Sequence, residues 1–461
     1  MSRGTAIDLC YLVAAISFIV ALKGLSSPKR ARSGNLLAAA GMALAIGATF
    51  ARAGLGHIGL MVIAMVVGVA IGVPAARLVK MTAMPQMVAA FNGVGGGAAA
   101  VVSITEFIGA DTKVLATYKI LEVVFGVLVG AVSFGGSALS FVKLQELMPT
   151  RPVTYPAQQV INGLVGLAAL GIVVAILVTS STALVWVLLA LALVLGVIFV
   201  LPIGGADVPV LISLLNSFTG IAVAASGFTL NSNLLVVAGT LVGASGILLT
   251  RMMSAAMGRS LPNILFSAFG SVVTASGSTE AAGGRSVRAG TPDDVGTLLA
   301  YSRKVVIIPG YGLAVAQAQH TAKELADALM AKGVEVFYAI HPVAGRMPGH
   351  MNVLLAEANV PYEELKEMDE ANLEMSTADV ALVVGANDTV NPAARNAPGS
   401  PIYGMPIINA DQAENIVFLK RSMRPGFAGI DNDLLYDPKT TMLFGDAKDT
   451  LQKLVAAVNK A

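Results

Sequence analysis

Nine apolar runs, each close to the length that crosses a lipid bilayer, lie within the first 258 of the 461 residues. About 20 apolar residues span the hydrocarbon core as a helix, so each run predicts a transmembrane helix. We expect these helices at residues 5–24, 34–52, 55–76, 84–108, 116–142, 157–179, 182–203, 208–228 and 232–252. Only 13% of the chain is charged, which excludes an ordinary soluble protein. The first run lacks the basic start and the cleavage site of a signal peptide.

Charge divides the chain into two parts. Residues 1–258 hold 13 basic and 6 acidic side chains, whereas residues 301–461 hold 14 and 19. We therefore expect a transmembrane domain over 1–258, a linker rich in Gly, Ser and Thr over 259–285, and a second domain over 286–461. No basic patch with interleaved aromatic residues indicates a nucleic-acid partner. The single cysteine, Cys10, excludes an internal disulfide and a CxxC site.

Basic residues gather in alternate connections between the predicted spans. The richer set has Lys23, Lys29, Arg30, Arg32, Arg77, Lys80, Lys143, Arg151, Arg251 and Arg259. The poorer set has Arg3, Arg52, Lys113 and Lys119. The richer side faces the cytoplasm by the positive-inside rule. An odd number of spans then places the N-terminus outside and the second domain in the cytoplasm.

Polar residues inside apolar spans cost free energy unless they have a partner or face water. The spans and their connections contain such residues, namely Asn92, Glu106, Glu122, Asn162, Asp207, Asn216 and Ser217. Each one suits a structural hydrogen bond between helices, but as a set they predict an ion or proton path. None of the four histidines lies deep in a span, so an imidazole relay would need another chain. Small residues at 93–98 and 239–246 predict close helix packing.

The second domain alternates strand and helix patterns. We expect a helix over 313–332 and strands at 304–309, 335–340, 380–385, 416–420 and 441–444. This alternation predicts a Rossmann-like, doubly wound α/β domain whose ligand lies at the carboxyl ends of the strands. His341 and His350 flank a proline-rich turn without cysteine or paired acids nearby, so we assign no metal site to them.

Two motifs fall at predicted strand ends. Gly310-Tyr311-Gly312 follows the first strand, where backbone N–H groups favour a phosphate, although Val315 replaces the third glycine of a dinucleotide fingerprint. No acid ends the second strand to bind a ribose hydroxyl, which argues against NAD. Lys420-Arg421-Ser422 ends a later strand and offers the donors that a 2′-phosphate needs. An exposed basic pair is the usual interpretation of Lys-Arg alone, but the position at a strand's carboxyl end favours a phosphate.

Several long strings also match a known family in order. They are IGGADVP at 203–209, GYGLAVAQAQ at 310–319, HPVAGRMPGHMNVLLAEA at 341–358, GANDTVNPAA at 385–394, KRSM at 420–423 and GDAK at 445–448. Over essentially its whole length the chain resembles the beta subunit of proton-translocating nicotinamide nucleotide transhydrogenase. The resemblance implies Re/Si-specific hydride transfer between NAD(H) and NADP(H), driven by proton entry across a bacterial-type inner membrane. It also implies an alpha component that holds NAD(H) and further transmembrane helices, and a dimer of alpha–beta units.

By position, the resemblance implies that this chain binds NADP(H). The pyrophosphate would lie against Gly310, Tyr311, Gly312, Val315, Val343, Ala344, Gly345, Arg346, Met347 and Pro348. The nicotinamide and its ribose would lie by Gly385, Ala386, Asn387, Asp388 and Thr389. The 2′-phosphate would meet Lys420, Arg421, Ser422 and Met423, beneath a lid through Gly426 and Phe427, with Asp446 and Ala447 closing the site. Asp388 is the catalytic candidate, which would couple protonation to nucleotide affinity. The family often has tyrosine where Phe427 stands.

In the membrane, the resemblance implies coupling or path roles for Asp207, Asn216 and Glu122, in that order, and for Asn92. Some members have histidine in place of Asn92, and others place that histidine in a helix of the alpha component, on which this chain would rely. The alternative hypothesis is a membrane transporter or channel whose dinucleotide domain only senses redox state. Only the enzyme needs a second nicotinamide facing the first.

Overall fold

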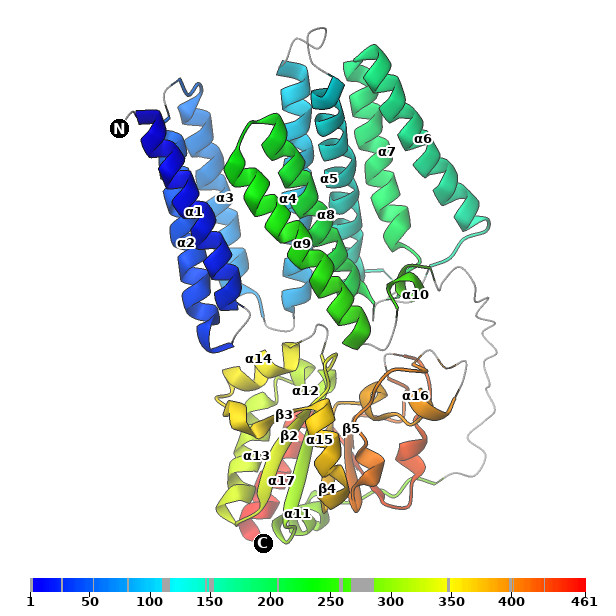
Figure 1. Cartoon of the computed structure of the whole chain (residues 1–461). Coiled ribbons are helices and arrows are strands. Elements are labelled where there is room, and N and C mark those ends of the chain that lie inside the picture. Colours follow the sequence, from blue (N-terminus) through cyan, green and yellow to red (C-terminus); the bar gives the residue numbers. More distant parts are fainter. Residues whose placement is uncertain are drawn as a thin grey trace. The chain divides into compact units, whose positions relative to one another are not determined.

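The structure is a computed structural model, and two compact units make it up, Met1–Arg251 and Met252–Ala461 (Figure 1). The residues that it describes are 3–25, 28–52, 54–80, 83–109, 117–145, 147–148, 153–204, 207–256, 260–266, 286–345, 349–397, 400, 402–426 and 428–461.

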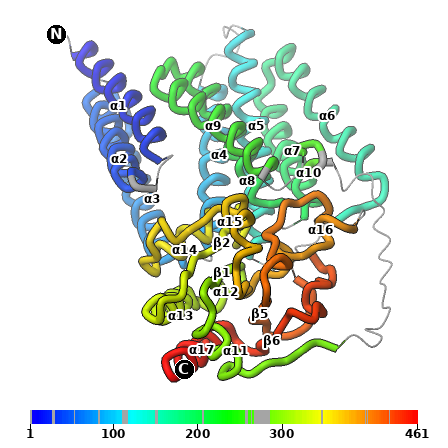
Figure 2. The backbone as a smooth tube through the Cα atoms, turned by 60° about the horizontal axis from the view of Figure 1, so that its bottom comes forward, coloured from blue at the N-terminus to red at the C-terminus, as the bar shows by residue number. Residues whose placement is uncertain are grey.

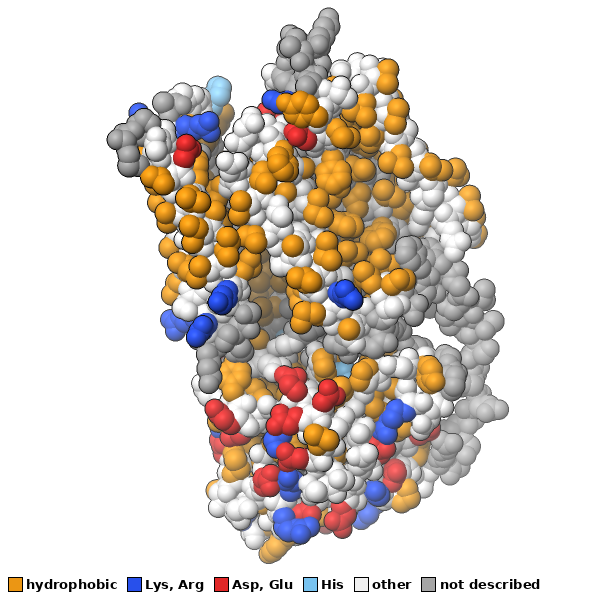
Figure 3. Space-filling view, viewed as in Figure 1, with side chains coloured by type: hydrophobic (Ala, Val, Ile, Leu, Met, Phe, Trp, Pro, Cys, Tyr) orange, Lys and Arg blue, Asp and Glu red, His pale blue; other side chains and the backbone are white. Residues whose placement is uncertain are grey.

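Among these described residues, nine helices are long and apolar enough to cross a membrane. They are α1 (Arg3–Leu25), α2 (Pro28–Phe50), α3 (Ile58–Leu78), α4 (Met84–Gly109), α5 (Thr117–Leu144), α6 (Gln158–Thr179), α7 (Thr182–Val200), α8 (Val208–Thr229) and α9 (Asn233–Ala256). The prediction of nine apolar helices is therefore confirmed. In the view of Figure 3, hydrophobic side chains cover much of these helices, whereas charged side chains gather on the second unit.

Helix α5 lies at the centre of the helical bundle, in contact with α4, α6, α7 and α8. Small residues let these backbones touch. A Cβ added at Gly130 of α5 would lie 2.6 Å from the carbonyl oxygen of Gly96 in α4, and one at Gly196 of α7 would lie 2.3 Å from that of Val132. In lipid there is no hydrophobic driving force for helices to associate, so the van der Waals contacts made by this close approach supply much of the packing energy. Helix α3, by contrast, has no buried residue.

The second unit contains a six-stranded sheet in the order β3-β2-β1-β4-β5-β6, and every neighbouring pair is parallel. Its strands are β1 (Lys304–Pro309), β2 (Glu335–Ile340), β3 (Leu365–Glu367), β4 (Val380–Val384), β5 (Asn415–Lys420) and β6 (Thr440–Phe444). Five of them confirm predicted strands. Strand β3 is not predicted from the sequence, because three residues with only one apolar side chain carry no strand pattern.

The second unit also contains short helices, several of which connect the strands. They are α10 (Leu261–Phe266), which falls within the predicted linker, α11 (Pro292–Ala300), α12 (Tyr311–Val315), α13 (Gln319–Ala331), α14 (His350–Glu357), α15 (Met368–Glu374), α16 (Ala393–Asn396) and α17 (Ala447–Lys460). The 3₁₀ turns are η3 (Tyr362–Glu364), η4 (Met375–Thr377), η5 (Asp388–Val390), η6 (Ala410–Gln412) and η7 (Asp433–Tyr436).

The prediction of a single helix over 313–332 is wrong, because the helix is interrupted between α12 and α13. Gln317 adopts a left-handed conformation with a φ of 50°. Its N–H donates to the carbonyl of Ala314, and the N–H of Ala318 donates to that of Leu313. These two bonds form a Schellman motif, which ends α12 without the glycine that usually signals it.

Both faces of the sheet are covered. Alternate strand residues such as Val306, Phe337 and Phe418 form one core with Met368 of α15 and with η4 and η7. On the opposite face, the hydroxyl of Tyr338 donates to the carbonyl of Ala322 in α13. Helix α17 packs against α11 and α13, as Figures 1 and 2 also show. This arrangement leaves the ends of the strands as the place where loops and polar residues meet.

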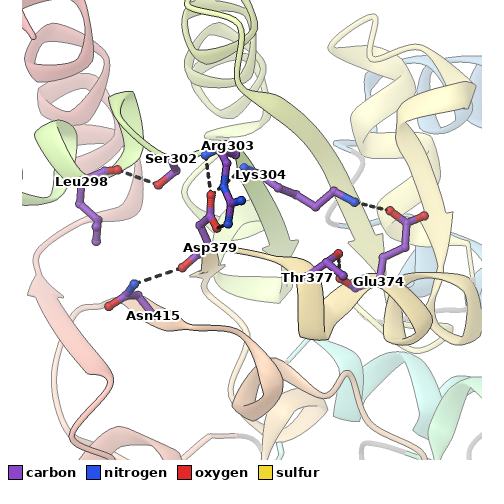
Figure 4. Close-up of polar contacts among 8 residues, drawn as sticks. All are labelled: Leu298, Ser302, Arg303, Lys304, Glu374, Thr377, Asp379 and Asn415. Atoms are coloured by element: carbon purple, nitrogen blue, oxygen red, sulfur yellow. Dashed lines mark hydrogen bonds and ion pairs between the residues drawn. The ribbon is translucent and has the colours of Figure 1, made fainter.

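Ion pairs fasten the amino-terminal ends of the strands (Figure 4). Asp379, just before β4, accepts hydrogen bonds from the guanidinium of Arg303 at 2.9 Å and from the N–H of Lys304. Glu374 accepts from the ammonium of Lys304 at 2.7 Å and from that of Lys366. The bond from Arg303 lowers the pKa of the Asp379 carboxyl, and those from Lys304 and Lys366 lower the pKa of Glu374.

We expect acid to destabilise this unit through the two carboxyls. A carboxyl with a lowered pKa in the folded state stabilises the fold above its unfolded pKa, near 4, and loses that contribution as the pH falls through the folded value. The melting temperature of the fragment 286–461 should fall between pH 5 and pH 2. The variant Glu374→Gln with Asp379→Asn should show a shallower fall, and an unchanged slope would contradict this assignment.

Candidate functional site

Two tight turns lie backbone to backbone at the carboxyl ends of β1 and β4. The N–H of Gly310 donates to the carbonyl of Val384, and the N–H of Gly312 donates to that of Gly385, each at 2.9 Å. A Cβ added at Gly310 would lie 2.4 Å from the Cα of Ala386. The sheet reverses its order between β1 and β4, which is where parallel α/β sheets bind ligands.

Gly385 has the strictest steric requirement in these turns. Its φ is 65°, a left-handed backbone conformation that residues with a Cβ rarely adopt. A Cβ there would also lie 2.5 Å from the Cα of Gly312 and 2.5 Å from the N of Leu313. The predicted glycine turn after β1 therefore depends on a second glycine that follows β4.

The loop after β2 begins with a buried histidine. The Nε2–H of His341 donates to the carbonyl of Pro406 at 2.7 Å, while Nδ1 accepts the N–H of Val343 at 3.2 Å. Burial lowers the pKa of His341, and the two ring hydrogen bonds fix the start of the 341–345 turn. The predicted contacts Arg346, Met347 and Pro348 lie outside the described residues. Within the part of the chain that the structure describes, no group of three His, Cys, Asp or Glu could hold a metal ion.

Asn387 and Asp388 join the end of β5 to the turn after β4. The ammonium of Lys420 donates to Oδ1 of Asn387 at 2.9 Å, and Nδ2 of Asn387 donates to Oδ1 of Asp388 at 2.9 Å. Oδ2 of Asp388 accepts the N–H of Ala428 at 2.8 Å. Burial lowers the pKa of Lys420, and the charges of Asp388 and Asp431 oppose that shift. These contacts hold the 421–432 segment against the site.

The sequence analysis missed two asparagines that anchor the same segment. Asn391 is fully buried and donates to the carbonyl of Asp431, and Asn432 is 1% exposed and donates to the carbonyl of Asn387. The oxygens of the two amides accept the N–H groups of Ala393 and Leu434. Asparagines within a loop give no sign in the sequence that they will be buried.

The remaining predicted contacts surround this edge of the sheet. Arg421 and Ser422 are exposed, whereas Met423, Thr389, Tyr311 and Ala447 are partly buried and Val315 is 43% exposed. Gly426 lies so close to the turn after β4 that a Cβ would meet Oδ1 of Asp388 at 2.4 Å. Asp446 caps α17 by accepting the N–H of Lys448. Phe427 lies outside the described residues.

In the helical unit, Asn92 is buried in a cluster of hydroxyl groups from α5 and α8. Its Nδ2 donates to Oγ of Ser137 at 2.8 Å and more weakly to Oγ of Ser133 at 3.4 Å. Ser133 in turn donates to the carbonyl of Leu215 and lies 2.6 Å from Oγ1 of Thr219. The sequence analysis named Asn92 but missed these hydroxyls, because serine and threonine are common in helices that pack closely.

Of the other predicted path residues, Asn216 lies in α8 beside Leu215 and three positions before Thr219, whereas Asp207 and Glu122 lie elsewhere in the chain. Asp207 is 6% exposed and directly precedes α8, yet its side chain makes no capping hydrogen bond to that helix. Its N–H donates to the carbonyl of Gly204 at 2.9 Å. Asn216, in α8, and Glu122, in α5, are each partly buried.

One residue assigned to a connection lies inside the bundle. The sequence predicts Lys143 in a cytoplasmic connection between two spans, but α5 continues to Leu144 and Lys143 is 1% exposed. Its ammonium donates to three carbonyl oxygens at the end of α7. The sequence analysis ended this helix early because a lysine normally marks the edge of an apolar run.

The described residues thus define a protein with a bundle of apolar helices of membrane-spanning length and a parallel α/β domain with a loop site at its switch point. Comparison with known proteins agrees with this architecture. Residues 7–457 match the model of the family described as NAD(P) transhydrogenase beta subunit. NAD(P) transhydrogenase subunit beta of Rhodospirillum rubrum is 47% identical over 455 residues, which are 97% of this chain and 98% of that protein. A protein of the same name from a defined strain of that species gives the same values.

This chain therefore belongs to the NAD(P) transhydrogenase beta subunit family. The family resemblance found in the sequence strings is confirmed.

Proposed function

We propose that this chain is the NADP(H)-binding component of an enzyme that transfers hydride between NAD(H) and NADP(H) and couples the transfer to proton translocation. Family membership supports the reaction. The observation that carries the nucleotide assignment is the meeting of three loops at one edge of the sheet: the turn at 310–312, the turn at 385–388 and the segment that begins at Lys420. We propose that residues 1–258 form the transmembrane domain, 259–285 the linker and 286–461 the NADP(H)-binding domain.

The sheet supports a Rossmann-like assignment for the second domain. Dinucleotides bind such folds at the crevice between the first and fourth strands, where the order 3-2-1-4-5-6 reverses. A phosphate chain needs close approach to backbone, and Gly310, Gly312 and Gly385 let the turns after β1 and β4 meet backbone to backbone at this edge of the sheet. Exposed Arg421 and Ser422 offer charged and hydroxyl donors beyond β5, which suit a 2′-phosphate. These residues fit NADP(H).

In this proposal each region of NADP(H) has its own loop. The turn that begins at Gly310 and the 343–348 turn hold the pyrophosphate, and residues 385–389 hold the nicotinamide and its ribose. Residues 420–423 hold the 2′-phosphate, the segment through 426 and 427 covers the site, and residues 446 and 447 close it. When bound, NADP(H) supplies the carbon that gives or accepts hydride. The chain itself binds and orients that carbon against a second nicotinamide, and such positioning supplies much of the rate.

Asp388 is the proposed catalytic residue, in the sense of coupling a proton to nucleotide affinity. Its carboxylate accepts hydrogen bonds from Ala428 and Asn387, so it joins the 421–432 segment to the turn after β4. Protonation would remove the negative charge that strengthens both bonds and would loosen the segment over the nucleotide. The same linkage requires that bound nucleotide change the proton affinity of the carboxyl.

In the membrane, we propose that Asn92, Asn216, Glu122 and Asp207 belong to the proton path or its coupling to the second domain. The hydroxyl cluster around Asn92 supports this assignment, because polar groups are costly in hydrocarbon and, where they occur paired inside a bundle, often mark ion or proton pathways. The chain would cross a bacterial-type inner membrane, with the N-terminus outside and the second domain in the cytoplasm. The alpha component would supply the NAD(H) site and further helices, in a dimer of alpha–beta units.

The purified chain, reconstituted alone in liposomes, should catalyse no hydride transfer from NADH to an NADP⁺ analogue. Only one nucleotide site is proposed here, so the activity should appear when the alpha component is added. Absorbance of the reduced analogue measures it. Activity without the alpha component would mean that a second nucleotide site lies on this chain. No activity with it would favour the alternative, a transporter or channel that only senses redox state.

Asp207→Asn, in the assembled enzyme, should lower proton-driven turnover about fivefold to thirtyfold. The neutral amide keeps the shape of the side chain but removes its charge and its ability to take up a proton. NADP(H) affinity of the fragment 286–461 should be unchanged, because that fragment does not contain the residue. The measurement compares turnover in proteoliposomes with and without a proton gradient. Wild-type coupling in this variant would remove Asp207 from the mechanism.

A further inference from the structure

The last turn of α5 contains a buried cation that the proposed proton path does not use. Lys143 is 1% exposed, and its ammonium donates to the carbonyl oxygens of Val200 at 3.1 Å, Leu201 at 2.6 Å and Ile203 at 2.8 Å. An ammonium has three N–H donors, so these acceptors match its capacity. The charge is therefore buried with full hydrogen bonding.

The three acceptors belong to the end of α7 and the turn that follows it. The last carbonyls of a helix have no partner within the helix and carry the negative end of its dipole. Lys143 adds a donor and a positive charge to these carbonyls, of which Val200 also accepts the N–H of Ile203 and Leu201 that of Val153. Removal of the ammonium would take a donor from each of these carbonyls and would leave that of Ile203 without the hydrogen bond that ties it to α5, so this contact fixes where α7 ends relative to α5.

The neighbouring residue connects the same turn to two other helices. The carbonyl of Leu144 accepts a hydrogen bond from Nε2 of Gln86 at 3.0 Å, at the start of α4. The side chain of Leu144 packs with Val208 and Ile212 in the first turns of α8. The last turn of α5 thus joins the ends of α4, α7 and α8.

The connection held by Lys143 leads directly to Asp207. Ile203, its third acceptor, stands four positions before Asp207, and the N–H of Asp207 bonds to the carbonyl of Gly204. The carbonyl of Asp207 then accepts the N–H of Leu211 as α8 begins. A shift at the end of α5 would therefore reach Asp207 through Ile203, Gly204 and the hydrogen bond from the N–H of Asp207.

We propose that Lys143 is a positioning residue for proton-coupled hydride transfer, which holds the α7–α8 connection so that Asp207 keeps its place. This inference rests on the coupling role proposed for Asp207. Lys143 acts through hydrogen bonds to backbone, so its contribution depends on donors and charge at the end of α7.

The test uses the complete alpha–beta enzyme in proteoliposomes. Lys143→Met keeps the length of the side chain but removes its charge and donors. The acceleration of turnover by an imposed proton gradient should fall about fivefold, while hydride exchange in detergent without a gradient should stay within about twofold. Lys143→Arg keeps the charge and donors and should recover most of the acceleration.

Two further variants separate positioning from folding. Ser140→Ala is the matched control, because Ser140 is buried one turn earlier and its hydroxyl donates to Gly136 within α5. It should leave both rates unchanged. The double variant Lys143→Met with Asp207→Asn should be no less coupled than Asp207→Asn alone, because both changes act through one connection. If Lys143→Met does not assemble, Lys143→Gln replaces it in the same measurements. Glutamine removes the charge but keeps an amide donor for the carbonyls.

Full acceleration in Lys143→Met would overturn the inference and leave the role of Asp207 intact. An equal loss of both rates and of melting temperature in Lys143→Met and Lys143→Arg would also overturn it, as the sign of a purely structural role. Full coupling in Asp207→Asn would instead overturn the proposed function of Asp207.

Discussion

Replacing Gly385 by alanine should destabilise the second unit by about 2–6 kcal/mol and abolish nucleotide binding. Left-handed backbone at a residue with a Cβ costs about 1–3 kcal/mol, and overlap in a packed interior costs about 1–3 more. Both apply here, because φ is 65° and the new Cβ would overlap Gly312 and Leu313. Urea unfolding of the fragment 286–461, followed by circular dichroism, gives the free energy of unfolding.

Gly333→Ala is the matched control for this prediction. Gly333 has a φ of 85°, but nothing lies within 4 Å of an added Cβ. It should therefore show the conformational cost alone, about 1–2 kcal/mol. The difference between the two variants measures the contact between the turns after β1 and β4. Equal losses in the free energy of unfolding would mean that the two turns can separate without penalty. The proposed pyrophosphate site at the turns after β1 and β4 would then lose its structural basis.

Arg421→Ala should lower the affinity of the fragment for NADP(H) about 10- to 150-fold, while its weak affinity for NAD(H) stays unchanged. Loss of one hydrogen bond to a charged group costs about 1.5–3 kcal/mol, and only NADP(H) has the 2′-phosphate that would receive it. Titration calorimetry with each nucleotide measures the two dissociation constants. The ratio between them, rather than either constant, tests the assignment of Arg421.

Arg424→Ala serves as the control, because Arg424 is an exposed cation in the same segment. If the effect of Arg421 depends on position, Arg424→Ala should change NADP(H) affinity less than about threefold, as expected for a change in exposed charge. Equal losses in the two variants would indicate general attraction between the segment and a polyanion. An unchanged preference in Arg421→Ala would exclude the residue from the 2′-phosphate site.

The sequence predicts the nine apolar helices and five of the six strands, because these elements are continuous apolar runs of characteristic length. It does not predict β3, whose existence depends on pairing with Tyr338 to Ile340 of β2. It also misses the break after α12, since Gln317 adopts its left-handed conformation only within the hydrogen bonds of the fold. In both places tertiary contacts determine the backbone conformation, which the local sequence pattern does not predict.

The same contrast between local sequence pattern and tertiary contacts applies to the candidate site. Glycine turns and a basic group at strand ends carry chemical signals that the sequence displays, and the family strings add the rest. Asn391, Asn432 and Lys143 carry no such signal, because their importance comes from burial against carbonyl groups far away in the chain. Polar residues that support a site through backbone contacts are visible only once the fold brings those contacts together.

The pairing of β1 with β4 also has a consequence for synthesis of the chain. Val305 pairs with Val380, so one edge of β1 stays open until about 75 further residues have left the ribosome. At roughly 5–20 residues per second this delay lasts about 4–15 s. During that time Val305 to Ile308 present one unpaired edge of an apolar strand, which is a template for aggregation, even after β2 pairs with the other edge. We therefore expect the nascent second domain to need protection by a chaperone until β4 emerges, and ribosome stalling before residue 380 should leave it protease-sensitive.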